Sequence, residues 1–355
     1  MIRPILPMML VTALIAGSCS GGESRMLDGT AAEIYGGTCA GSNGREVTVY
    51  SGRTENLIGP ALEAFACETG TEVAVRWGSS TDLALLLAEE GDRTPADVFL
   101  SRSPGPVGFL EADALLGSID DDVLALVGVD SRSQSGTWVG FSGRKRVLVH
   151  NLDAVPSEEL PESVFDLTDA RYRGRVAIPA TNGSFVDWFT VFRDQYGSDV
   201  ASRWLNSMVA NDARYSPNNR SIVEAAGRGE IDMGLVNHYY QYQEAATAGD
   251  RHRAANHDLA DGDIGSLLII TAATITADSD NRQAANELIG YLLSEPVQRY
   301  FSAETFEYPL AAGVEPADVL PPLKALEIGS VDFDGLGGGF AETIAIIEAS
   351  GILDQ

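Results

Sequence analysis

The chain has 355 residues, a hydrophobic fraction of 45% and a formal net charge of −27 at pH 7. This length can hold two domains, and the mean hydropathy of −0.01 is typical of a globular protein. The negative field repels nucleic acid and anionic lipid and attracts cations. With only 4 histidines, the composition argues against a histidine-rich zinc or copper site.

The first 18 residues are predicted to be an export signal. Arg3 gives a positive start, and the apolar run over residues 5–15 is short for a membrane span. Small residues precede Cys19, as at a lipoprotein processing site, so we expect Cys19 to carry a lipid. The alternative is an ordinary cleaved signal with an incidental cysteine. With a lipid, residues 19–45 would form a tether that anchors the protein at the outer face of the cell membrane or in the periplasm.

Two further cysteines, Cys39 and Cys67, remain in the exported chain. In an oxidising compartment they could form a disulfide, which would tie the N-terminal extension to the first long helix. The alternative is two separate buried thiols. We favour the disulfide.

The pattern that follows alternates between strand and helix. Apolar alternation predicts strands, and a 3.6-residue apolar period with a capping Ser80 or Thr81 predicts helices. In chain order these are a strand at 46–50, a helix at 57–67, a strand at 73–77, a helix after 80 and a strand at 96–100. A βαβαβ unit of this kind forms an open parallel sheet with helices on both faces.

The second half repeats this alternation, so we predict a second α/β lobe. The expected strands are 147–150, 176–178, 231–236 and 267–273. The expected helices are one that begins near 185, one around 204–205, one that begins at 222, one over 281–293 and a last one around 340–347. Ligands of open α/β sheets lie beyond the carboxyl ends of the strands. The segments there are 51–54, 78–80, 101–103, 181–184, 218–219 and 237–240. They are polar, lack cysteine and contain only one histidine, which predicts a cleft for an oxygen-rich ligand.

Adjacent tyrosines, Tyr239 and Tyr240, follow one of these buried strands. Phenolate oxygen is a hard ligand that suits ferric iron, and tyrosine ligates iron in catalase. Tandem tyrosines also pack against cores, so the pair alone does not decide between the two roles. If this stretch is extended, His238 points away from its neighbours and packs elsewhere.

The polar segments, in this order, resemble the ferric-ion-binding solute receptors of bacterial iron(III) ABC importers, also called bacterial transferrins. The likeness runs from residue 46 to the C-terminus and is carried by residues 47–53, 89–99, 142–144, 181–185, 237–240 and 307–310. It implies a two-lobe, periplasmic-binding-protein-like class II fold. Each lobe would be a mostly parallel sheet flanked by helices, with the ligand between the lobes. The N-lobe would comprise 46–141 and 265–318, and the C-lobe 142–264 and 319–355.

The resemblance also implies site residues and partners. Tyr239 and Tyr240 would bind Fe(III), and a synergistic anion, carbonate or phosphate, would be held by Asn182, Gly183, Ser184, Asn219 and Asn237. The protein would be a monomer that does no catalysis and delivers iron to an ABC permease and its ATPase. One departure concerns Thr54 and Arg102, which stand where some relatives have a histidine and a glutamate ligand. Because neither can replace those ligands, the chain is closer to members that use tyrosines and an anion.

The charges of ferric iron and its expected ligands support this interpretation. Two phenolates cancel two of the three charges of ferric iron, and a carbonate or phosphate could supply the rest. Arg53 and Arg102 have the fork geometry that binds such an oxyanion, although either could form a salt bridge across the cleft instead. Free N–H groups at the helix start near Ser184 would also favour an anion. For Arg144, a nearby carboxylate is the expected partner.

Two other functions compete with this interpretation. A solute receptor for a small anion without metal would use the same arginines and serines. An enzyme is disfavoured, since the sequence has no Gly-x-Ser-x-Gly elbow, no His-Glu-x-x-His and no phosphate-binding Gly-rich loop ending in Lys-Ser/Thr.

Overall fold

The predicted βαβαβ unit is present in the computed structural model, which describes residues 13–14, 25–323 and 339–355. Strands β2 (Glu46–Ser51), β3 (Glu72–Trp77) and β4 (Val98–Ser101) are parallel, with β2 in the middle. Helices α2 (Glu55–Thr69), α3 (Ser80–Glu90) and α4 (Pro104–Ala112) connect and follow them. We call this part of the molecule the N-lobe.

Helices α10 (Arg282–Leu292) and α11 (Glu295–Ala303) complete the N-lobe. Its smaller elements are β1 (Ala13–Leu14), α1 (Gly29–Ile34), β5 (Leu116–Gly117), α5 (Asp121–Leu124) and β12 (Tyr308–Pro309). Valines of β2, β3 and β4, together with Leu100 of β4, pack against apolar residues of α2 and α10 on one face of the sheet.

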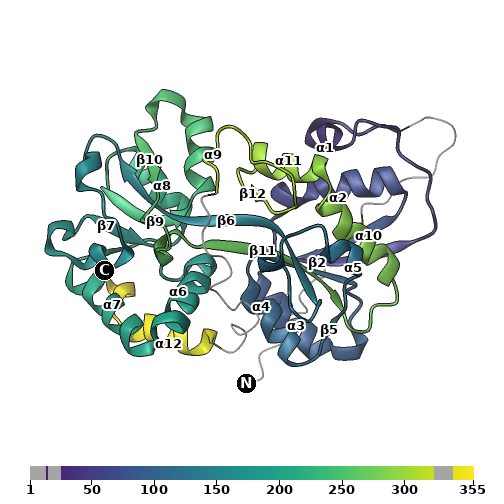
Figure 1. Cartoon of the computed structure of the whole chain (residues 1–355), viewed down its shortest axis with the longest axis horizontal. Helices are drawn as coiled ribbons and strands as arrows, with labels where there is room; N and C mark the ends of the chain where they lie inside the picture. The colour runs from purple at the N-terminus through teal and green to yellow at the C-terminus, as the bar shows by residue number, and fades with distance from the viewer. Residues whose placement is uncertain (1–12, 15–24, 324–338) are drawn as a thin grey trace, which may run out of the picture.

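A second parallel unit forms the C-lobe. Strands β7 (Val176–Ile178), β8 (Arg214–Tyr215) and β9 (Met233–Asn237) are parallel to one another. Strand β10 (Ala254–His257) pairs with the long strand β6 (Trp138–Asn151), on the side opposite to β9. The helices are α6 (Gly183–Tyr196), α7 (Ser198–Ala210), α8 (Asn219–Gly227), α9 (Tyr239–Ala248) and α12 (Phe340–Ala349). Figure 1 shows α12 beside α6 and α7, so the chain ends on the C-lobe.

Two long strands join the lobes. Strand β6 (Trp138–Asn151) is buried along its whole length and pairs antiparallel with β11 (Leu268–Thr276) in the N-lobe and with β9 in the C-lobe. Figure 1 shows both strands running between the two halves of the molecule. The strand order is β1-β3-β2-β4-β11-β6-β9-β7-β8. The expectation of parallel strands therefore holds for β2, β3 and β4 and for β7, β8 and β9, whereas the crossing strands run against their neighbours.

Residues 25–45, which the sequence placed in a tether, are folded onto the N-lobe. Helix α1 packs against α2, and Cys39 and Cys67 form a disulfide. Gly70 ends α2 with a φ of 72°, and a Cβ there would lie 2.1 Å from the carbonyl oxygen of Gly41. Only glycine permits both this turn and this close approach of the extension.

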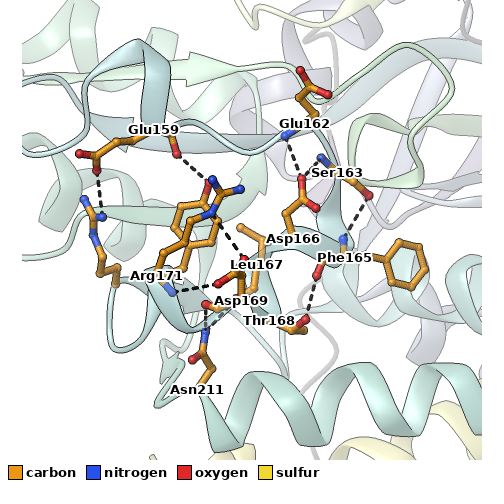
Figure 2. Close-up of polar contacts among 12 residues, drawn as sticks. Glu159, Glu162, Ser163, Phe165, Asp166, Leu167, Thr168, Asp169, Arg171 and Asn211 are labelled. Carbon is orange, nitrogen blue, oxygen red and sulfur yellow. Dashed lines mark hydrogen bonds and ion pairs between the residues drawn. The ribbon is translucent and has the colours of Figure 1, made fainter.

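The connection between β6 and β7 is fixed by side chains that bond to backbone groups (Figure 2). The Ser163 hydroxyl and the Asp166 carboxylate cap the same short turn reciprocally. The Asn211 amide donates to the carbonyl oxygens of Leu167 at 3.1 Å and of Asp169 at 2.8 Å. These bonds fix the approach to β7 and hence the start of α6, where several candidate site residues lie.

Two predictions about the membrane concern different parts of the chain. The export signal, except for residues 13–14, and Cys19 lie outside the described residues. Among the residues that are described, no helix has the length and apolar character required to span a bilayer.

Candidate functional site

The paired tyrosines open a helix rather than extend a strand. Strand β9 ends at Asn237, His238 has helical backbone angles, and α9 begins at Tyr239. His238 is buried, its Nδ1 accepts from the N–H of Lys145 at 3.0 Å, and burial lowers its pKa to about 3. The expectation of an extended stretch was wrong, but the conclusion that His238 packs away from the ligand holds.

The two phenols lie against each other. Their ring centroids are 4.2 Å apart with the planes inclined at 32°, and Tyr239 is only 5% exposed. Burial, the neighbouring Tyr239 and a hydrogen bond with it raise the pKa of Tyr240, while Arg144 and Arg102 oppose this increase. The two phenols are therefore in hydrogen-bonding contact, and the charges of Arg144 and Arg102 act on Tyr240.

A network of neutral polar groups lies beside the tyrosines at the starts of α6 and α8. The Asn182 side chain caps α6 by accepting from the N–H of Ser184 at 3.1 Å and from its hydroxyl at 2.7 Å. Asn219, 1% exposed, donates to Asn182 at 3.0 Å and to the Ser184 hydroxyl at 3.1 Å, and its oxygen accepts from the N–H of Asn237 at 3.2 Å. The structure thus brings four of the predicted anion-binding residues together.

Arg146 belongs to the same network and was missed in the sequence. It is fully buried, donates from Nη1 to Asn219 at 3.2 Å, and donates from Nη2 to the carbonyl oxygen of Ser184. Burial, followed by repulsion from Arg144, lowers its pKa to about 9. The signal that could have revealed it is the run of three basic residues inside strand β6, where buried positions normally carry apolar side chains.

Arg144 is 2% exposed and lies two positions along the same strand. Its Nε and Nη2 atoms have no hydrogen-bond partner, and no carboxylate in the described part of the chain forms an ion pair with it. The expected ion pair with a nearby carboxylate is therefore absent from the described residues, although the charge of Arg144 acts on the carboxylate of Asp187. Its charge acts on Tyr240, on Arg102 and on Arg146.

Arg102 reaches this group from the N-lobe. A Cβ on Gly183 would lie 3.8 Å from Nη2 of Arg102, so the guanidinium lies against the first turn of α6. Burial and repulsion from Arg144 lower its pKa. Asp187, from the second turn of α6, acts on the same guanidinium and was also missed in the sequence. Burial raises the pKa of Asp187, while a hydrogen bond with Ser103 and the charges of Arg144, Arg102 and Arg146 lower it.

Arg53 does not belong to this group. It is 2% exposed and donates to the carboxylate of Glu307 at 2.6 Å; the other oxygen of Glu307 accepts from the hydroxyl of Ser142 at 2.6 Å. This ion pair is the alternative that the sequence left open for Arg53, and it occupies Nη2 of the guanidinium while Nε has no hydrogen-bond partner among the described residues. Thr54 is the exposed residue that precedes α2, and it too is no ligand.

The donor set limits what the site can bind. Among the described residues, no group of three or more histidine, cysteine, aspartate or glutamate side chains could hold a metal ion. The tyrosines are instead surrounded by the guanidinium groups of Arg102, Arg144 and Arg146 and by a single carboxylate, Asp187. A cation bound there would need the phenolates as ligands, and the remaining positive charge favours an accompanying anion.

A family model and several known proteins match this chain. The family model for bacterial extracellular solute-binding proteins matches residues 94–333, more than half of the chain. The chain is 27% identical to the Fe(3+)-binding periplasmic protein of Serratia marcescens over 298 residues, which covers 83% of this chain and 88% of the relative. It is 28% identical to the major ferric iron-binding protein of Neisseria meningitidis over 291 residues, which covers 81% and 87%.

A solved structure has the same fold. The iron-bound HitA of Pseudomonas aeruginosa superposes with a TM-score of 0.78 at 28% identity, and the match covers 86% of this chain and 99% of HitA. These relatives are named for binding rather than for catalysis. The chain belongs to the family of bacterial extracellular solute-binding proteins.

Proposed function

We propose that this protein binds ferric iron outside the cytoplasm, together with a small oxyanion, for delivery to an ABC importer. The observation that supports the iron assignment is the contact between the neighbouring phenols of Tyr239 and Tyr240 beside the charges of Arg144 and Arg102. Phenolate is a hard ligand suited to a trivalent cation. Relatives named for ferric iron, 27% and 28% identical over more than four-fifths of this chain, support the same cargo.

The charges around the tyrosines support the anion. Ferric iron with two phenolates keeps one positive charge, and three guanidinium groups with one carboxylate add to it. Carbonate or phosphate would offset this charge and supply oxygen ligands. We infer that Arg102, Gly183, Ser184 and Asn237 would contact it. Asn182 and Asn219 instead use their side chains to hold Ser184 and Arg146, and the free amide of Asn237 supports this division of roles.

Visible spectroscopy tests the iron assignment. Metal-free protein is titrated with ferric citrate, with and without bicarbonate or phosphate, and phenolate-to-iron charge transfer should produce a coloured band. Replacing Tyr239→Phe and Tyr240→Phe together should abolish it. The matched control is Tyr242→Phe. Tyr242 lies on the same helix, but its ring packs on Phe306. An unchanged band in the double variant would exclude these ligands.

A receptor for a small anion without metal is the second candidate. It is favoured by the buried guanidinium of Arg144, which lacks a carboxylate partner in the described structure. The tyrosines would then line the anion site without losing their protons. Thermal stabilisation by phosphate or bicarbonate, with no effect of ferric citrate, would support this function and exclude iron as the cargo.

Export and delivery complete the proposal. Cys19 would carry the lipid that anchors the monomer at the outer face of the cell membrane or in the periplasm, and an ABC permease with its ATPase would receive the iron. The segments 46–141 with 265–318 and 142–264 with 319–355 would move as two bodies about β6 and β11. Labelling cells with a radioactive fatty acid tests the anchor, because Cys19→Ser should lose the label and be released as soluble protein.

A further inference from the structure

Three consecutive residues after α11 contact both lobes, and we call Phe306, Glu307 and Tyr308 the strap. Tyr308 begins β12 and pairs antiparallel with Gly143 of the crossing strand β6. Figure 1 shows β12 between α11 of the N-lobe and α9 of the C-lobe. The sequence motif that contains Glu307 and Tyr308 therefore lies where the two lobes meet, outside the ligand site itself.

The middle residue of the strap is fixed to the N-lobe. The Glu307 side chain is fully buried, and its carboxylate accepts from Arg53 at 2.6 Å and from the hydroxyl of Ser142 at 2.6 Å. The backbone N–H of Glu307 donates to the carbonyl oxygen of Phe301 in α11 at 2.9 Å. These three bonds connect the strap to the loop after β2, to β6 and to α11.

The outer residues of the strap contact the start of α9. The ring of Tyr308, 1% exposed, stacks on the imidazole of His238, with centroids 4.9 Å apart and planes inclined at 28°. The ring of Phe306 stacks on Tyr242, with centroids 5.7 Å apart and planes inclined at 24°. The His238 ring in turn meets Tyr239 edge-on at 5.9 Å. One imidazole therefore separates the strap from the paired tyrosines.

The backbone of the strap has an unusual conformation at Phe306. Its φ is 58°, in the left-handed region that glycine adopts freely and a bulky side chain rarely adopts. Such conformations persist where surrounding contacts hold them, and they cluster at functional sites. Since glycine would fit this turn without strain, the contact of the Phe306 ring with α9 explains why a large side chain is present.

We propose that the strap fixes the first turns of α9 to the N-lobe, and that Phe306 and Tyr308 are positioning residues for the phenols of Tyr239 and Tyr240. They touch no ligand and act through His238 and Tyr242. Groups that orient metal ligands contribute to affinity without binding the metal. This inference deepens the proposed function and rests on it for the iron measurement alone, because the order of α9 can be measured without iron.

Hydrogen exchange on the metal-free, full-length protein tests the strap. Tyr308→Leu should speed exchange of the α9 amides about 10-fold, because a stacked aromatic pair is lost. Tyr308→Phe should keep the protection, since it keeps the ring and loses only the hydroxyl that donates to the carbonyl oxygen of Pro321. If Tyr308→Leu does not fold, Phe306→Asn replaces it, because asparagine tolerates a positive φ and has no aromatic ring.

The matched control is Tyr300→Leu. Tyr300 is also a buried tyrosine whose hydroxyl donates to a backbone carbonyl oxygen, that of Leu57, but its ring packs in the N-lobe core. This variant should melt at a lower temperature than the wild type and leave exchange of the α9 amides unchanged. It separates a specific effect on α9 from a general loss of stability.

Titration with ferric citrate then tests the positioning role. Tyr308→Leu should bind iron about 10-fold more weakly and shift the wavelength of the phenolate-to-iron band, although both phenols are still present. Tyr308→Phe should restore the wild-type affinity and wavelength. Tyr300→Leu should match the wild type in both measurements.

Each outcome decides one part of the inference. Wild-type exchange of α9 in Tyr308→Leu or in its replacement would overturn the strap, and so would equally fast exchange in Tyr300→Leu. Faster exchange with unchanged iron affinity and wavelength would overturn the positioning role. Faster exchange in the strap variant, with no coloured band in the wild type, would support the strap and exclude the proposed iron cargo.

Discussion

Two arginines near the junction of the lobes are equally buried and differ only in their partners. Arg53 and Arg144 are each 2% exposed. Arg53 meets the carboxylate of Glu307 at 2.6 Å and has one nitrogen, Nε, without a hydrogen-bond partner among the described residues, whereas Arg144 has two such nitrogens and no ion pair there. A buried ion pair completed inside the protein serves the fold. A buried cation left incomplete beside two phenols is suited to a ligand, because its desolvation is compensated only when the ligand arrives.

The largest effect is expected from removing the partner of Arg53. Glu307→Gln should lower the free energy of unfolding by about 3–5 kcal/mol, because it leaves the Arg53 charge buried and unpaired. Chemical denaturation measures the change. In the double variant Arg53→Met/Glu307→Leu, most of the lost stability should return. A loss below about 1 kcal/mol in Glu307→Gln would show that the two arginines are in similar environments after all.

The next largest effect is expected on iron affinity, and it tests whether the charges around Arg144 belong to a metal site. Burial and Tyr239 raise the pKa of Tyr240, so this phenol is protonated throughout the neutral range and iron must displace its proton. With a proton displaced from each phenol, iron affinity should fall by about 100-fold for each pH unit of acidification. Competition with a chelator of known affinity, corrected for its own titration, measures this slope. An affinity that does not depend on pH would contradict phenolate ligation.

A third arginine extends the comparison, because Arg146 is fully buried and both of its terminal nitrogens donate to neutral groups. Asn219→Ala should cost about 2 kcal/mol of unfolding free energy, since it removes partners of Arg146, Ser184 and the N–H of Asn237. Denaturation with Asn218→Ala as a neighbouring comparison measures it, because Asn218 caps the same helix but contacts only Ser221. Equal losses in both variants would mean that Asn219 acts merely as part of the helix start.

The smallest effect is expected from a solvent-exposed pair. Arg299 and Glu295 lie one helical turn apart on α11, with side chains 71% and 63% exposed. Glu295→Gln should change the free energy of unfolding by less than about 1 kcal/mol, because water screens the charges. A larger loss would show that pairing alone, without burial, explains the effect at Glu307.

Much of the fold could be predicted from local patterns. The alternating strands and helices of both lobes, the disulfide between Cys39 and Cys67 and the paired tyrosines are all readable, since periodicity and residue chemistry are local properties. The antiparallel crossing of β6 and β11 was not predicted, because the direction of a strand depends on which distant strand it pairs with.

The arginines show the same limit at the site. The sequence identified Arg53 and Arg102 as cationic residues at strand ends but gave no means of telling which charge was already neutralised. Glu307 is 254 residues from Arg53 in the chain, and Asp187 is 85 residues from Arg102. The sequence by itself determined the chemistry available to this protein: two phenols, several guanidinium groups and a polar set of loops. Only the tertiary structure decided which charges are paired, because ion pairing depends on distance in space and on burial, and neither is encoded by neighbouring residues.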